Sequence, residues 1–134
     1  MKILLVHNFY QQPGGEDTVF ELEAAMLKKA GHELFTYQRS NSEILKMGML
    51  GKMAVPAKMI WAWDSAKAIR ALLAKIRPDL VHFHNTFMLI SPGAYFTCKN
   101  MGIPVVQSLH NPRLLCPASS FFRQGSACNE CLGK

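Results

Sequence analysis

Apolar residues gather in short runs along the chain, and these runs alternate with longer stretches in which apolar residues recur at helical spacing. Three runs are typical of strands buried in a parallel sheet, and one segment alternates like a half-buried strand. The expected strands are residues 3–7, 32–37, 79–83 and 103–108. Strands that alternate with helices form a parallel sheet with right-handed crossovers. We therefore expect an α/β fold with a Rossmann-like parallel sheet flanked by helices.

The stretches of helical spacing begin and end at residues typical of helix termini. The first expected helix has Glu16 and Asp17 in its opening turn, where acids complement the helix dipole, and Gly31 follows its end. Its apolar positions are Val19, Leu22, Met26 and Ala30. Residues 57–76 are expected to form one further helix, and residues 91–101 another that opens with a serine cap and a proline.

Two segments give less regular signals. Residues 42–54 contain several apolar side chains interrupted by Gly48 and Gly51, so we expect a short irregular helix or a mobile loop. Beyond His110 the chain is expected to be an irregular loop.

Length and composition fit one globular domain over residues 1–134. The chain is 49% hydrophobic and 18% charged, which excludes a disordered protein. Its formal charge of +6 favours an anionic partner, but nucleic acid is not expected because no nucleic-acid-binding motif accompanies the charge. The N-terminal apolar run is too short for a signal peptide, and no run is long enough to span a membrane. A cytoplasmic location is expected.

The segment Pro13-Gly14-Gly15-Glu16 joins the first expected strand to the first helix. Adjacent glycines let a ligand approach the backbone, and the free N–H groups of a helix N-terminus favour a phosphate. A simple tight turn explains the glycines equally well. The segment is not the G-x-G-x-x-G motif of dinucleotide-binding folds.

A histidine followed by an asparagine stands at the end of three separate expected strands. The pairs are His7-Asn8, His84-Asn85 and His110-Asn111. Ligands bind outside the carboxyl ends of the strands in such sheets, where an imidazole can bond a sugar hydroxyl, hold a phosphate or move a proton. A single histidine there often makes only a structural hydrogen bond, but three at equivalent positions favour a ligand site.

The cysteines and the basic residues of the middle helices are further candidates. Cys116, Cys128 and Cys131 contain a Cys-x2-Cys half-site, but structural zinc normally needs four ligands, and free thiols or a redox pair are alternatives. The basic residues are Lys46, Lys52, Lys58, Lys67, Arg70, Lys75 and Arg77, with Trp61 and Trp63 among them. They suit either docking on an anionic membrane or a solvated face over core tryptophans.

Three segments, in their order and spacing, resemble the N-terminal domain of the GT-B glycosyltransferases of family four. They are residues 13–16, 79–84 and 105–111. Residues 113–131 are similar to one bacterial branch of that family. The likeness covers essentially the whole chain and implies the N-terminal half of a GT-B fold, in which two Rossmann-like domains enclose the active site.

The resemblance implies a retaining transferase that moves a sugar from a nucleotide-sugar donor to an acceptor hydroxyl, without a cofactor or metal. The acceptor would be a glycan, a polysaccharide or a lipid-linked sugar, as in cell-surface polysaccharide biosynthesis. Peripheral contact with the inner membrane face is a further expectation.

Site residues follow from the same resemblance. The glycines after the first strand lie near the donor diphosphate in the family, so Gly14, Gly15 and Glu16 are the donor-binding candidates. The histidine after the fourth strand contacts the transferred sugar, which makes His110 the expected catalytic residue. Many relatives have aspartate at the next position, where this chain has Asn111. The acceptor-binding candidates are His84, Asn85, Asn111 and Trp61.

The family places the nucleotide site and a pair of glutamates in a C-terminal domain, which residues 1–134 do not contain. We therefore expect negligible transferase activity from this chain alone, and self-association through the exposed interdomain face. A stand-alone module that binds a glycan or a phosphorylated ligand without catalysis is the alternative. A small metal-dependent module built on the cysteines is a third possibility.

Overall fold

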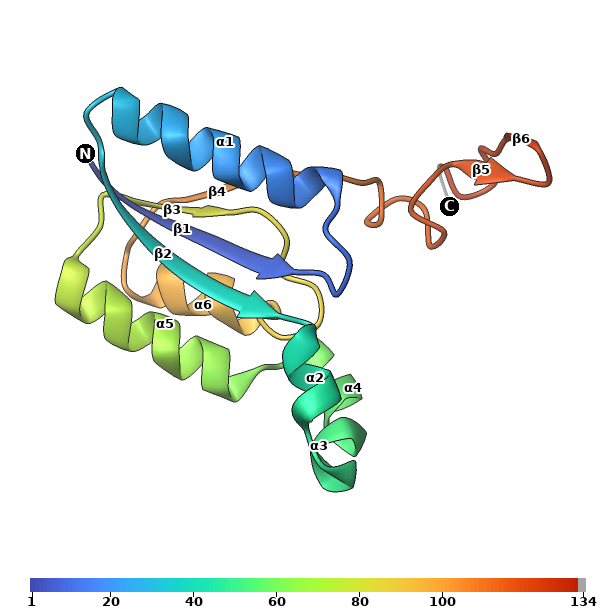
Figure 1. Ribbon diagram of the computed structural model, residues 1–134, viewed down its shortest axis with the longest axis horizontal. Coiled ribbons are helices and arrows are strands. Elements are labelled where there is room, and N and C mark those ends of the chain that lie inside the picture. Colours follow the sequence, from blue (N-terminus) through green and yellow to red (C-terminus); the bar gives the residue numbers. More distant parts are fainter. Residues whose placement is uncertain (133–134) are drawn as a thin grey trace.

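The computed structural model describes residues 1–132 and contains a four-stranded parallel sheet with helices on both faces (Figure 1). The strands are β1 (Lys2–Phe9), β2 (Glu33–Ser40), β3 (Leu80–Phe83) and β4 (Val105–Gln107). Their order is β2-β1-β3-β4, and all three pairings are parallel. The chain therefore has the expected Rossmann-like arrangement. The strand order reverses between β1 and β3, and ligands of such sheets bind at that point.

Side chains of the strands alternate between two apolar layers. The longer helices are α1 (Gly15–Lys29), α5 (Trp63–Ile76) and α6 (Gly93–Asn100). Ile3 and Leu5 pack with Phe20 beneath α1, whereas Leu4 and Val6 pack against α5 and α6 on the opposite face (Figure 1). The period of two along β1 thus buries both sides of the strand, as its continuous apolar sequence predicts.

The first helix forms where it was expected, but its predicted apolar side is wrong. Exposed side chains on α1 are Val19, Leu22 and Met26, at 44%, 61% and 65%. The helix instead turns Asp17 and Phe20 toward the sheet, with Ala24 and Leu27 partly buried. This second set has the same helical spacing, and it faces inward because Asp17 bonds the buried His7. Gly31 follows the helix with a φ of +83°, as its position predicted.

The single helix expected over residues 57–76 is also wrong. The structure has α4 (Val55–Ile60) and α5, separated by an extended residue at Trp61. The Ala62 N–H donates to Ser91 Oγ at 2.7 Å, and this bond between distant segments redirects the chain. Ser91 Oγ also accepts the Gly93 N–H at 3.3 Å, but the predicted serine cap is wrong by one residue, because α6 begins at Gly93 and its N-cap is Pro92.

Residues 42–54 are helical but irregular, as one of the two expectations had it. They form α2 (Ser42–Lys46) and α3 (Met49–Met53), which project with α4 beyond the end of β2 (Figure 1). The segment after His110 is mainly loop, but it also contains the short antiparallel pair β5 (Phe122–Arg123) and β6 (Ser126–Ala127). Within residues 1–132, every helix is too short or too polar to cross a membrane.

Candidate functional site

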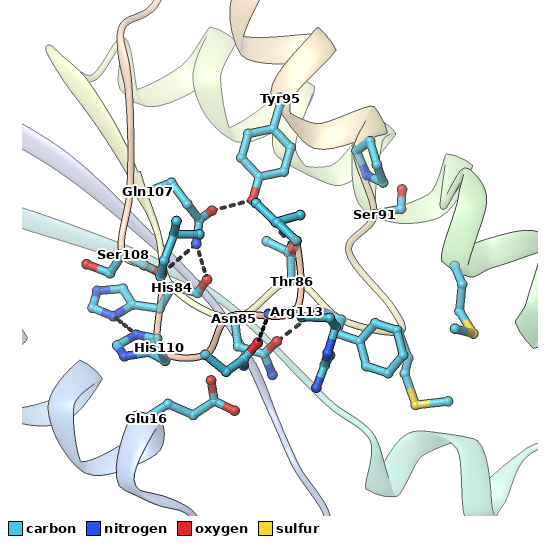
Figure 2. Close-up of a pocket in the computed structure, with 17 residues that line it drawn as sticks. Glu16, His84, Asn85, Thr86, Ser91, Tyr95, Gln107, Ser108, His110 and Arg113 are labelled. Carbon is cyan, nitrogen blue, oxygen red and sulfur yellow. Dashed lines mark hydrogen bonds between the residues drawn. The ribbon is translucent and has the colours of Figure 1, made fainter. Parts of the chain in front are cut away.

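Two adjoining hollows lie where the strands end. The inner pocket, of about 460 Å³, lies among the loops that follow β3 and β4 and the start of α6 (Figure 2). The outer hollow, of about 600 Å³, lies between the glycine loop before α1 and the segment after His110. Glu16, His110, Asn111 and Arg113 line both. The two hollows therefore share a wall, and their volumes are in the range of small-molecule sites.

The structure brings seven of the eight candidate residues to these hollows. Gly14, Gly15, Glu16, His110 and Asn111 line the outer hollow, and His84 and Asn85 line the inner pocket with the last three of these. Trp61 is the exception, since it lines neither. Its ring packs against Trp63 and Phe96 at the junction of α4 and α5.

The glycine loop has no conformational need for its two glycines. Gly14 has an extended φ of −125°, and Gly15 already belongs to α1. A Cβ atom added at either position would meet no atom within 4 Å. A tight turn therefore does not explain these glycines, whereas open space beside the backbone is what close approach of a ligand requires.

Asp17 fixes the position of this loop. Its Oδ1 lies 2.7 Å from Nε2 of the buried His7, and its Oδ2 accepts the Gly14 N–H at 2.9 Å. One carboxylate thus joins β1 to the first turn of α1. Sequence reasoning gave Asp17 only a role in the helix dipole, because nothing in the sequence shows that it faces His7.

His84 and His110 lie side by side in the wall of the inner pocket (Figure 2). His84 Nδ1 and His110 Nε2 share a hydrogen bond of 3.1 Å, and the two rings stack at 5.3 Å between centroids. Burial, together with the positive charge that His82, His110 and His7 would carry, lowers the pKa of His84 to about 3. His84 is therefore neutral at pH 7, with one ring nitrogen that donates a hydrogen bond and one that accepts.

His7, Asn8 and Asn85, from the first two histidine–asparagine pairs, have mainly structural roles. His7 and Asn8 lie inside β1, which continues to Phe9, and both are fully buried. Asn85 Nδ2 donates to the Asn8 carbonyl at 2.7 Å, and Asn85 Oδ1 accepts the Phe87 N–H at 3.0 Å. These bonds hold the loop after β3 against the end of β1 and leave little of the Asn85 amide for a ligand.

Three pocket residues were missed by sequence reasoning. Gln107 Nε2 donates to the carbonyls of His84 and Ser108 at 2.5 and 2.7 Å, and the Tyr95 hydroxyl donates to Gln107 Oε1 (Figure 2). Arg113 stacks over the Phe87 ring at 4.3 Å. These residues lie on α6, in β4 and in the segment after His110. Only the fold brings them together, so no spacing in the sequence signals them.

The cysteines do not form a common ligand set in residues 1–132. Cys98 and Cys116 are buried, Cys128 is half-buried and Cys131 is exposed, and all four are free thiols. Burial in the core raises the pKa of Cys98 to about 11.

The fold and the site together define an α/β protein with a ligand site at the carboxyl ends of its strands, beside a helix N-terminus. The family model described as Glycosyltransferase Family 4 matches residues 13–126, which include Gly14, Gly15 and His110. This chain belongs to that family and is a glycosyltransferase-family domain. No curated protein and no solved structure gives a significant match.

Proposed function

We propose that residues 1–134 form the acceptor-side half of a retaining GT-B glycosyltransferase, which moves a sugar from a nucleotide-sugar donor to an acceptor hydroxyl. One observation carries this proposal: the glycine loop and His110 line the same outer hollow. The donor would place its diphosphate at the loop and its sugar toward His110. Neither a cofactor nor a metal is assigned to the transfer itself.

Backbone donors and one arginine would bind the diphosphate. The Gly14 N–H is already bonded to Asp17, so the donors offered by this helix start are the N–H groups of Gly15 and Glu16. The positive end of the α1 dipole supports the same charge. Arg113 is the only lysine or arginine among the residues in the described chain that line the two hollows. Together these groups would stabilise negative charge on the departing diphosphate.

The inner pocket is the proposed acceptor site. Its polar wall contains Tyr95, Gln107 and the His84–His110 pair, which suit the hydroxyl groups of a sugar (Figure 2). The Glu16 side chain points toward this pocket and would accept a bond from a hydroxyl (Figure 2). His110 borders both hollows and would position the transferred sugar between donor and acceptor.

A lipid-linked acceptor would agree with the surface of α2, α3 and α4. Exposed apolar side chains there are Leu45, Met49, Leu50, Met53 and Ile60, and Trp63 adjoins them at the start of α5, all between 63% and 83% exposed. Lys46, Lys52 and Lys58 lie on the same three helices. Apolar side chains beside lysines favour an anionic bilayer surface, so we propose peripheral contact at the cytoplasmic face of a membrane. Trp61, at this junction, would then contact the lipid portion of the acceptor.

A second Rossmann-like domain would supply the opposite wall of the cleft and the nucleotide-base pocket. Leu109, Leu114 and Leu115 are 67%, 80% and 61% exposed beside the site, which suits a surface covered by such a domain or by a second copy. Residues 1–134 alone are expected to give negligible turnover, because positioning both substrates supplies much of the rate.

A transfer assay tests the proposal. Residues 1–134 would be assayed alone and as part of the longest product that their gene encodes, with uridine and guanosine diphosphate sugars. Turnover with retention by a product that includes a second domain, abolished by His110→Ala, supports the proposal. Ligand binding without turnover in every form would instead favour a stand-alone binding module.

A further inference from the structure

Glu23, His82 and His84 form a compact cluster beneath α1, on the side of His84 that faces away from His110. Glu23 Oε1 lies 2.8 Å from His82 Nδ1, and Glu23 Oε2 lies 3.6 Å from His84 Nε2. All three ligand atoms lie within 4.8 Å of one another, and no other group of three potential metal ligands occurs in residues 1–132. His82 lies in β3 and His84 directly follows the strand, two positions further along, so both rings lie on the face that α1, with Glu23, covers.

One atom of this cluster has no partner within the protein. His84 Nε2 makes no hydrogen bond within the protein. Water cannot replace the missing partner from the surface, because the side chain is 0% exposed. A buried polar atom without a partner is costly, so a native structure that contains one needs an explanation. Glu23 Oε2 lies 3.6 Å away, which is too long for a hydrogen bond.

We infer that Glu23, His82 and His84 bind a divalent transition-metal ion, of which Zn²⁺ is the best match. Two imidazoles and one carboxylate are a recurrent metal-ligand set, with water completing the coordination. Metal–ligand bonds of about 2.0–2.2 Å place tetrahedral ligand atoms roughly 3.4 Å apart. The distances from Glu23 to the two imidazoles, 2.8 and 3.6 Å, lie on either side of that spacing. The ion would give His84 Nε2 its missing partner.

The second nitrogen of each imidazole already has the partner that a metal ligand needs. His82 Nε2 bonds Ser108 Oγ at 2.9 Å, and His84 Nδ1 bonds His110 Nε2 at 3.1 Å. Such outer partners fix the tautomer and orientation of ligating histidines. Burial lowers the pKa of His82 and of His84, so both rings are neutral at pH 7, the state that binds a metal.

The site would act on the proposed active site through His84. A metal on Nε2 leaves the proton on His84 Nδ1, which then donates to His110 Nε2. His110 in turn keeps its own proton on Nδ1. The ion would therefore position His110 in one tautomer without contacting either substrate.

Zinc and cobalt titrations test the inference. The background would carry Cys116→Ser, Cys128→Ser and Cys131→Ser, which removes thiol ligands, and Zn²⁺ affinity would be measured against a chromophoric chelator. Glu23→Gln preserves shape on a partly exposed residue and is expected to weaken Zn²⁺ binding by at least about 100-fold, since loss of an outer partner alone costs 10–100-fold. Ser108→Ala is expected to weaken it by about 10–100-fold.

His32→Gln is the matched control, because His32 precedes β2 at the other end of the sheet. The Zn²⁺ affinity of this variant should equal that of the background. Circular dichroism would establish that each variant is folded. Cobalt should give visible bands typical of nitrogen and oxygen ligands, and Zn²⁺ should raise the melting temperature of the background but not of Glu23→Gln. Absence of stoichiometric binding, or equal affinity in Glu23→Gln and the background, would overturn the inference.

Discussion

His84 Nδ1 lies 3.1 Å from His110 Nε2, so a histidine with almost no exposed surface holds the ring of the histidine that borders both hollows. Because one nitrogen must donate and the other accept, the tautomer of His84 determines that of His110. His84 is thus a positioning residue, and His110 is the residue proposed to contact the sugar.

This relationship predicts that the two histidines act as one unit. With a chelator present, His110→Ala is expected to weaken binding of a nucleotide sugar about tenfold, and His84→Ala to weaken it by a similar factor. The double variant should lose little more than either single one, because both changes remove the same oriented imidazole. Titrations followed by NMR would measure the binding affinity of the wild type, both single variants and the double variant, with His32→Ala as control. Additive losses would contradict the coupling.

The glycine loop predicts loss of binding without loss of stability. Neither glycine needs a special backbone angle, and a Cβ atom meets nothing within 4 Å. Gly15→Ala is expected to keep or raise the free energy of unfolding, by up to about 1 kcal/mol. It should weaken nucleotide-sugar binding about tenfold by filling the path of the diphosphate.

Gly48→Ala is the matched control, because its Cβ also has open space but lies far along the chain at the start of α3. Urea unfolding and NMR titration would give the two quantities for each variant. Unchanged binding in Gly15→Ala would leave the glycines without a ligand role.

Asp17 predicts a stability effect that the sequence pattern does not reveal. Asp17→Ala leaves the buried His7 Nε2 and the Gly14 N–H without their acceptor. We expect the free energy of unfolding to fall by about 2–3 kcal/mol. Urea denaturation measures it, and Glu21→Gln, an exposed acid on the same helix, should change it by less than about 0.5 kcal/mol. Equal effects of the two changes would show that Asp17 does not anchor the loop.

Acid pH is expected to weaken the contact that ties the end of β2 to α2 and α5. Burial alone would raise the pKa of Glu43 and Asp64, but bonds from Arg39 and Ser40 to Glu43, and from Lys58 to Asp64, hold both pKa values below their ordinary range. A carboxyl with a lowered folded pKa stabilises the fold above its unfolded value and loses this contribution as pH falls through the folded value. The loss should therefore begin below about pH 5.

Arg39→Gln isolates that contribution. Both carboxylates are about two-fifths exposed. The free energy of unfolding of the wild type should therefore exceed that of the variant by about 1 kcal/mol or less at pH 7, and by almost nothing at pH 3. Urea unfolding between these pH values measures the difference, with Lys28→Gln as control. A difference that does not change with pH would contradict the ionic explanation.

The fold was predictable because its signals are local. The apolar run that became β1, the acids and Gly31 at the ends of α1, and the serine before α6 each report on their own segment. The break at Trp61 was not predictable, since it depends on a bond from Ala62 to Ser91, 29 positions away. The inward side of α1 likewise depends on the contact between Asp17 and His7.

The same division holds for the candidate site. The rule that ligands bind at strand ends located His84 and His110, and the structure places them side by side. Gln107, Tyr95 and Arg113 come from three segments with no shared spacing, so only tertiary structure joins them. Val106 and His82 are paired across β3 and β4, yet their surroundings differ. Val106 is exposed, whereas His82 bonds Glu23 and Ser108.

Binding of a diphosphate at the glycine loop is the most direct measure of the proposed donor site. Amide NMR spectra of the 15N-labelled chain would be recorded during titration with a nucleoside diphosphate to millimolar concentration. We expect the signals of Gly15 and Glu16 to shift first, together with those of His110 and Arg113, and Arg113→Gln to weaken the effect most at low salt. Signals that stay fixed at these four residues, or that shift only on α2 to α4, would contradict it.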